Sequence, residues 1–209
     1  MSQHLPLQLT TFVGRGAQMD EIRGILAEYR LVTLTGAGGA GKTRLAIEVA
    51  GRMASEFPDG VWYADLAAVS YPEVVPVAVA RAFGLPDQPG RSITDTLLRY
   101  VRDRNMLLVL DNCEHLLEAS AGLVTDMLAA SSKVTILATS REPLLVPGEV
   151  NWGVPSLSLA DEAIELFSDR ARRAKPEFVV NCSSRRRSRS TTCGRRSPGV
   201  TKTTTLQRL

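Results

Sequence analysis

Apolar residues follow two spacings along this chain, and the two alternate from one segment to the next. Short runs that are continuously apolar or rich in β-branched residues predict strands, and apolar positions three or four residues apart predict helices. The expected strands are 31–35, 60–66, 106–110 and 133–140, with a weaker fifth at 150–154. The expected helices are 18–29, 42–55, 72–83, 92–102, 114–130 and 160–174. This alternation predicts an α/β fold of three layers, with a mostly parallel sheet of about five strands.

The pattern stops near Val180 and sets the expected domain boundaries. Residues 1–12 form an extended arm, residues 13–178 one domain, and residues 179–209 a tail rich in Arg, Ser and Thr. The tail holds almost no large apolar side chain, so it cannot offset the entropy of ordering and is expected to be disordered.

Charge is distributed unevenly between these parts. Residues 181–209 hold eight basic residues and no acidic one, so residues 1–180 carry 17 basic and 22 acidic residues and are mildly acidic. No apolar run approaches 18 residues and the N-terminus does not resemble a secretory signal, so we expect no membrane span and a cytoplasmic protein. Three distant cysteines, Cys113, Cys182 and Cys193, give neither a zinc motif nor a disulfide framework.

A glycine-rich segment between the first strand and the next helix matches the phosphate-binding pattern GxxxxGK[ST], the Walker A motif or P-loop. Glycines let backbone amides curl around a phosphate, and the helix N-terminus favours the anion. Lys42 would reach the β- and γ-phosphates, and the Thr43 hydroxyl would bind Mg²⁺. A merely flexible turn has no use for Lys-Thr at these positions. The expected nucleotide-binding residues here are Gly36, Ala37, Gly38, Gly39, Ala40, Gly41, Lys42, Thr43 and Arg44.

A second acidic element has the form of a Walker B motif. The apolar strand 107–110 runs into Asp111, which would hold Mg²⁺ together with Thr43. A cap on the following helix is the alternative and is compatible with that role. The next residue, Asn112, is an amide and cannot accept a proton. Glu114 could activate water or could simply favour a helix dipole, so binding is predicted more securely than hydrolysis.

Arg141 follows the strand 133–140, at the edge of the sheet where a cation could sense a γ-phosphate. A surface ion pair is the alternative. The catalytic candidates are therefore Lys42, Asp111, Glu114 and Arg141. Because the chain lacks an Asn-Lys-x-Asp guanine motif, the expected cofactors are ATP or ADP with Mg²⁺.

Several segments in fixed order resemble the nucleotide-binding domain of STAND-type (NB-ARC-like) regulatory ATPases. They are FVGR, VTLTGAGGAGKTRLA, VWYADLA, LLVLDNCEHLL, ILATSREPL and VPSLSLADEAIELF. The similarity is to the large ATP-binding transcriptional regulators of the AfsR/LuxR type, and it covers residues 10 to about 178.

This resemblance implies further roles. Val13, Gly14 and Arg15 would lie beside adenine, Arg141 would be the sensor arginine, and Pro155 would lead toward a lid. The implied activity is a slow switch, closed with ADP and competent for signalling with ATP and an inducer.

The chain also departs from the family pattern. No acidic residue follows Arg15 closely, and the Gly-Leu-Pro-Leu lid motif and the DNA-binding helix-turn-helix are absent from this sequence. We therefore expect a truncated regulator with an aberrant tail. DNA would be bound by the regulator domains that this sequence lacks, or weakly by the basic tail. A domain without its lid is expected to expose apolar surface, which favours self-association.

Two alternatives to a regulatory module stay open. One is a self-sufficient ATPase, which Asn112 and the lack of a second-substrate motif disfavour. The other is a nucleic-acid-binding protein that uses its basic tail for salt-dependent contacts with phosphates. The tail arginines in question are Arg185, Arg186, Arg187, Arg189, Arg195 and Arg196.

Overall fold

The computed structural model describes residues 3–8, 15–86 and 90–155 of the 209-residue chain. The expected helix at 160–174, the boundary at residue 178 and the basic tail lie outside these residues. Within them, no helix combines the length and the apolar character needed to cross a membrane.

Eleven helices and strands make up the described part. The strands are β1 Gln3–His4, β2 Leu31–Thr35, β3 Val61–Asp65, β4 Leu107–Asp111, β5 Thr135–Ser140 and β6 Val150–Gly153. The α-helices are α1 Gly16–Glu28, α2 Lys42–Arg52, α3 Val75–Ala82, α4 Ile93–Val101 and α5 Leu117–Ala130. Three short 3-10 turns, η1 Ala54–Glu56, η2 Pro72–Val74 and η3 Cys113–His115, lie between them.

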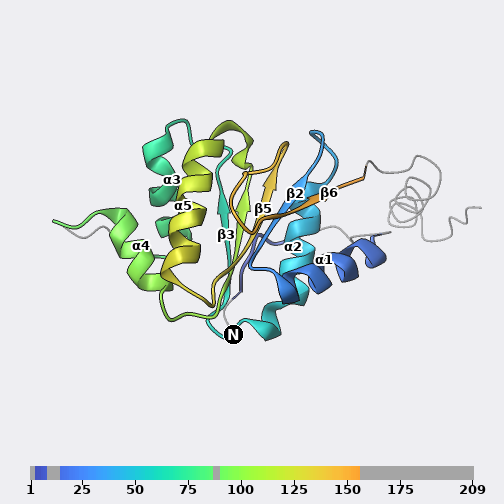
Figure 1. Ribbon diagram of the computed structural model, residues 1–209, viewed down its shortest axis with the longest axis horizontal. Coiled ribbons are helices and arrows are strands. Elements are labelled where there is room, and N and C mark those ends of the chain that lie inside the picture. Colours follow the sequence, from blue (N-terminus) through green and yellow to red (C-terminus); the bar gives the residue numbers. More distant parts are fainter. Residues whose placement is uncertain (1–2, 9–14, 87–89, 156–209) are drawn as a thin grey trace, which may run out of the picture. The chain divides into compact units, whose positions relative to one another are not determined.

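The strands form one sheet in the order β1-β3-β4-β5-β2-β6, and every neighbouring pair is parallel. The chain steps across the sheet from β2 to β3 and then returns through β4 to β5. Because crossovers between parallel strands are right-handed, this reversal places α2 on the opposite face from the helices of the return path. Figure 1 shows α1 and α2 on one face and α3, α4 and α5 on the other.

Two apolar cores fill the spaces between the sheet and its helices, and β4 contributes to both. Side chains alternate along a strand, so Leu107 and Val109 pack with α1 and α2, while Leu108 and Leu110 pack with α3, α4 and α5. All four are fully buried. This explains why β4 is apolar at consecutive positions, as expected for a strand covered on both faces.

The structure corrects three details of the expected elements. The arm adds a sixth strand, because Gln3 and His4 pair with Val61 and Trp62 and the His4 ring stacks on Trp62 at 4.0 Å. The helix expected at 42–55 ends at Arg52 and gives way to η1.

The third correction concerns the helix expected at 114–130, which is interrupted at Leu116. That residue has φ −134° and ψ 41°, outside helical geometry, so Glu114 lies in η3 and α5 begins at Leu117.

Cys113 gives a pH-dependent prediction for the stability of this fold. Its side chain is fully buried, and burial, helped by the charge of Asp111, raises the pKa of the thiol from 9.0 to about 12. Above pH 9 the unfolded chain loses this proton while the folded chain keeps it, so the free energy of unfolding falls as pH rises through that window. For Cys113 alone the loss between pH 8 and pH 10 is about 1.4 kcal/mol.

Urea unfolding of the wild type and of Cys113→Ala at both pH values measures this contribution. The variant is expected to be less stable at pH 8 because it leaves a small cavity, but to lose less stability than the wild type on going to pH 10. An equal loss in both proteins would contradict the assignment.

Candidate functional site

The glycine-rich turn from β2 into α2 lies at the carboxyl edge of the sheet, and we call it the phosphate loop after its sequence motif. Gly36 has φ 150°, and a Cβ there would lie 3.1 Å from the carbonyl oxygen of Val154. Gly41 has φ 84° and caps the 11-residue helix α2. Both positions therefore require glycine, and the loop ends at a helix N-terminus that favours an anion.

Lys42 lies across this loop. The residue is 9% exposed, and Nζ donates to the carbonyl oxygens of Gly36 at 2.8 Å and Ala37 at 3.1 Å. These bonds hold the ammonium group inside the loop, where the positive charge would meet a bound phosphate. Two backbone carbonyls at the start of the loop thus position the ammonium group that the sequence motif identified.

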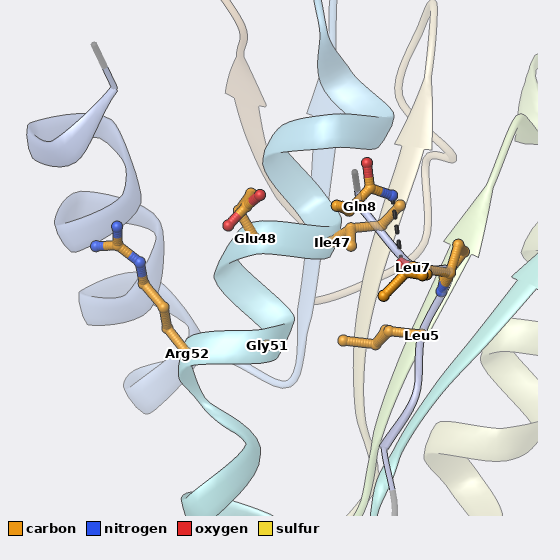
Figure 2. Close-up of a pocket in the computed structure, with 8 residues that line it drawn as sticks. Leu5, Leu7, Gln8, Ile47, Glu48, Gly51 and Arg52 are labelled. Carbon is orange, nitrogen blue, oxygen red and sulfur yellow. Dashed lines mark hydrogen bonds between the residues drawn. The ribbon is translucent and has the colours of Figure 1, made fainter. Parts of the chain in front are cut away.

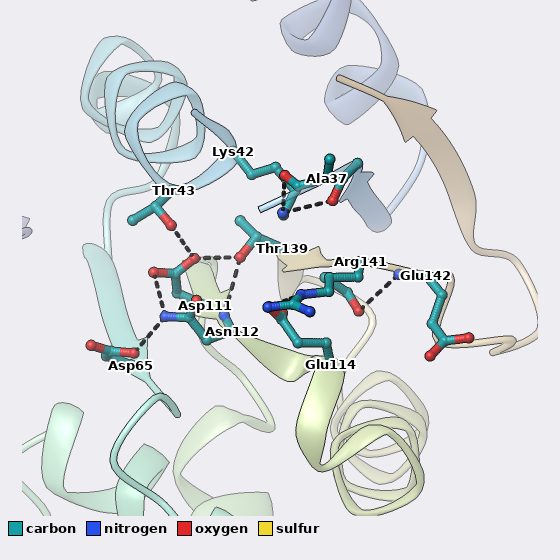
Figure 3. A network of polar contacts seen from close by, with 12 residues as sticks. Ala37, Lys42, Thr43, Asp65, Asp111, Asn112, Glu114, Thr139, Arg141 and Glu142 are labelled. Atoms are coloured by element: carbon teal, nitrogen blue, oxygen red, sulfur yellow. Dashed lines mark hydrogen bonds and ion pairs between the residues drawn. The ribbon is translucent and has the colours of Figure 1, made fainter. Parts of the chain in front are cut away.

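Asp111 is the centre of a polar network at the end of β4 (Figure 3). The residue is 1% exposed, and Oδ1 of its carboxylate accepts hydrogen bonds from the Thr43 hydroxyl at 2.9 Å and from the Thr139 hydroxyl. Oδ2 accepts from the Tyr63 hydroxyl at 2.7 Å and from Asn112 Nδ2 at 3.1 Å. None of these donors is a backbone amide of the following helix. The contacts of Asp111 therefore favour a role beside Thr43 of the phosphate loop over a role as a helix cap.

Sequence reasoning missed Tyr63, Thr139 and Asp65 in this network. Burial, followed by the hydrogen bond and charge of Asp111, raises the pKa of the Tyr63 hydroxyl, so the phenol stays protonated and remains a donor. These residues come from β3 and β5, the two strands that flank β4. Predicting these contacts requires the strand order, and the local sequence does not show which strands are neighbours in the sheet.

Thr43 and Asp111 are suited to hold a hard divalent cation. Both offer oxygen atoms, and the 2.9 Å contact places the two groups where one ion could bridge them. No group of three or more His, Cys, Asp or Glu side chains that could hold a metal occurs in the part of the chain that the structure describes. A bound ion would therefore complete its shell with water and phosphate oxygens, as Mg²⁺ commonly does.

Glu114 and Arg141, both proposed from sequence, contact each other. Arg141 Nε lies 3.3 Å from Glu114 Oε1, and the arginine side chain is 68% exposed. The ion-pair alternative for Arg141 is therefore observed, and its role toward phosphate stays a prediction. The pair lines a cavity of about 470 Å³ with Asn112, which places both residues beside the Asp111 network.

Arg15 lies against the phosphate loop beside Gly41. The residue is 3% exposed, and its guanidinium donates to the carbonyl oxygen of Pro155 at 3.2 Å and lies 3.6 Å from where a Cβ on Gly41 would be. The structure thus brings Arg15 to the loop. Val13 and Gly14, expected beside adenine, lie outside the described residues.

Arg44 has contacts that lead away from the loop. Its guanidinium pairs with Glu48 at 2.9 Å and bonds to the side-chain oxygen of Gln8. Gln8 and Glu48 line a separate cavity of about 430 Å³ between the arm and α2 (Figure 2). A contact between Arg44 and a nucleotide therefore stays a prediction.

Known proteins with similar sequences include several that are named as regulators. The chain is 56% identical over 159 residues to "Putative HTH-type transcriptional regulator Rv0890c" of Mycobacterium tuberculosis, covering 76% of this chain and 18% of that protein. It is 47% identical over 176 residues to the uncharacterized protein Rv0894 of the same species, covering 84% and 45%. It is 31% identical over 185 residues to the regulatory protein AfsR of Streptomyces coelicolor, covering 78% and 18%. The chain thus spans less than half the length of these relatives.

Solved structures share the fold at low sequence identity. Cdc6p from Pyrobaculum aerophilum aligns with 81% of this chain and 52% of its own, at 15% identity and a TM-score of 0.61. A signal transduction ATPase with numerous domains and a tetratricopeptide repeat sensor, from Pyrococcus horikoshii, aligns with 86% and 28%, at 16% identity and a TM-score of 0.52. No family model matches the chain.

Proposed function

The described residues form a P-loop NTPase domain of the kind carried by AfsR-type regulators, and from this premise we propose that the chain is a regulatory module that binds Mg·ATP and Mg·ADP. The observation that carries the proposal is the convergence of three groups at one edge of the sheet. Lys42 lies inside the phosphate loop, and the Thr43 hydroxyl contacts the buried carboxylate of Asp111.

The same geometry supports a switch more than a fast enzyme. Asn112 occupies the position after the metal-binding aspartate, and the exposed Arg141 is paired with Glu114. Such a site would bind nucleotide with its phosphates on the loop and hydrolyse it slowly. The bound nucleotide, ATP or ADP, would then set the state that the module communicates.

We place this module within the regulator architecture of its relatives. Transcriptional control, helix-turn-helix contacts with DNA and an inducing signal would belong to parts of a longer regulator, since the relatives extend well beyond the matched region. The Arg15 contact with Pro155 would tie the nucleotide site to the segment that follows β6.

Phosphate release at saturating Mg·ATP distinguishes a switch from an enzyme. Typical enzymes turn over at about 1 to 1,000 s⁻¹, and we expect this chain to release phosphate well below about 1 s⁻¹ while binding ATP and ADP stoichiometrically. Steady-state turnover at or above that value would favour the self-sufficient ATPase. Mg·GTP is the control nucleotide. If the chain bound GTP as tightly as ATP, the expected preference for adenine would be wrong.

A further inference from the structure

Hydrogen-bond donors of the described residues occupy the whole carboxylate of Asp111. A carboxylate offers about four lone-pair positions, two on each oxygen. The Thr43 hydroxyl at 2.9 Å and the Thr139 hydroxyl donate to Oδ1. The Tyr63 hydroxyl at 2.7 Å and Asn112 Nδ2 at 3.1 Å donate to Oδ2. A cation that binds this carboxylate must therefore take the place of one of these donors.

The protein around Thr139 and Asn112 fixes which way both groups donate. The Thr139 hydroxyl accepts from the backbone N–H of Asn112 at 3.1 Å, and its single hydrogen is left for Asp111. Asn112 Nδ2 also donates to Asp65 Oδ1 at 2.8 Å. The opposite orientation of this amide would set its carbonyl oxygen against two carboxylates, all of them acceptors. Neither donor can leave Asp111 without losing a second contact.

Tyr63 is held in place by the strand that carries it. In the pairing of β3 with β4, Tyr63 lies opposite Val109, and Asp65 lies opposite Asp111. Val109 is fully buried in the core beneath α1 and α2, and the half-buried Tyr63 packs against the same core. Side chains two residues apart share one face of a strand, so Asp111 lies on this face as well. The core thus supports the tyrosine ring while its hydroxyl reaches Oδ2.

Thr43 differs from the other three donors because its own oxygen is suited to the same ion. Its hydroxyl lies in the first turn of α2, directly after Lys42 of the phosphate loop. Of the positions on Asp111, the one that Thr43 fills is therefore the one where an ion, or a water bound to that ion, would meet the carboxylate. Such an ion would meet Oδ1 alone, since Tyr63 and Asn112 cover Oδ2.

We propose that Tyr63 sets the cation selectivity of the site, because it covers Oδ2 and leaves Asp111 one oxygen for the ion. The inference rests on the proposed function, since it takes the ion to arrive with a nucleotide. Mg²⁺ demands nearly ideal octahedral geometry and keeps several waters, whereas Ca²⁺ takes about six to eight oxygens and often both oxygens of one carboxylate. A carboxylate with one open oxygen suits Mg²⁺ and denies Ca²⁺ a bidentate contact.

Tyr63→Phe keeps the ring and removes only the hydroxyl. Titrations of ATP into the full chain with EDTA, with saturating Mg²⁺ and with saturating Ca²⁺ give the factor by which each ion raises the affinity. For the wild type, we expect the Mg²⁺ factor to exceed the Ca²⁺ factor by at least about tenfold. In Tyr63→Phe this ratio is expected to fall at least about threefold, with the Kd in EDTA changed by less than about twofold.

The ratio of the two factors separates cation selectivity from a purely structural role of Tyr63. Losing a donor also leaves more negative charge on the carboxylate, but that change affects both ions alike and cancels in the ratio. If the Tyr63 hydroxyl served only to satisfy a buried carboxylate, Tyr63→Phe would shift the urea unfolding midpoint and leave the ratio at the wild-type value. That result would overturn the proposal.

Asn112→Gly is the second variant, because it removes the other donor to Oδ2. Glycine accepts the left-handed backbone of this position, where φ is 62°. The ratio is expected to fall in this variant as well. Tyr29→Phe is the matched control, since it removes the same hydroxyl from a tyrosine that is 46% exposed at the end of α1, and it should keep the wild-type ratio. Circular dichroism verifies that each variant is folded.

The outcomes distinguish this inference from the proposed function. A wild-type chain that binds ATP equally well with Mg²⁺ and with Ca²⁺ would overturn the inference and leave nucleotide binding standing. Wild-type ratios in both Tyr63→Phe and Asn112→Gly would do the same. A folded chain that binds no nucleotide under any of the three conditions would refute the proposed function, and the inference would fall with it.

Discussion

Replacing Lys42 with alanine is expected to lower the affinity for Mg·ATP by at least about 100-fold, roughly 3 kcal/mol. The ammonium group lies inside the phosphate loop and is held there by two backbone carbonyls. A hydrogen bond from the Lys42 ammonium group to a phosphate oxygen would contribute about 1.5–3 kcal/mol to binding. No other side chain of the loop carries a positive charge that could replace it. Titration calorimetry with Mg·ATP on both proteins measures the loss.

Lys133→Ala is the matched control for this prediction. Because Lys133 is exposed and precedes β5, its replacement removes the same charge from the chain without touching the loop. We expect the affinity of this variant to equal that of the wild type. Equal weakening by both substitutions would mean that net charge, and not the position of Lys42, governs nucleotide binding.

Mg²⁺ is expected to raise the affinity for ATP, and Asp111→Asn is expected to reduce that increase at least about tenfold, roughly 1.4 kcal/mol. The amide keeps one side-chain oxygen as an acceptor but loses the negative charge that attracts the ion. Asp111→Ala goes further, since it leaves the buried hydroxyl of Thr139 and the half-buried hydroxyl of Tyr63 without their acceptor. That variant is expected to lose about 2–4 kcal/mol of folding stability as well.

ATP titrations with Mg²⁺ and with EDTA separate these effects, and urea unfolding measures the change in stability. Asp126→Asn, on the exposed face of α5, is the control for the loss of one carboxylate. If Mg²⁺ raised the ATP affinity of Asp111→Asn as much as that of the wild type, Asp111 would not be a metal ligand.

The phosphate loop and the end of β4 could be predicted from sequence because their chemistry is local. Gly36 follows β2 and Gly41 precedes α2 within eight consecutive residues, and the strand bounds 31–35 match the structure. Asp111 comes directly after four apolar residues of the same strand. In each case the residues that matter are neighbours along the chain, so a short pattern contains them all.

The surroundings of Asp111 could not be predicted in this way. Tyr63 and Thr139 reach it because β3 and β5 flank β4, and that order depends on crossovers and packing rather than on any one segment. The left-handed backbone at Asn112 and the interruption at Leu116 were also hidden, because the apolar positions in 114–130 keep a helical spacing across them. The same periodicity predicts Glu114 at a helix start, whereas it lies in η3 and pairs with Arg141.

Titration calorimetry of Mg·ATP and Mg·ADP into the full chain tests the central claim most directly. We expect saturable binding of one nucleotide per chain, and we expect the Lys42→Ala variant to lose it. A chain shown to be folded by circular dichroism that gave no binding heat with either nucleotide, at several temperatures, would contradict it.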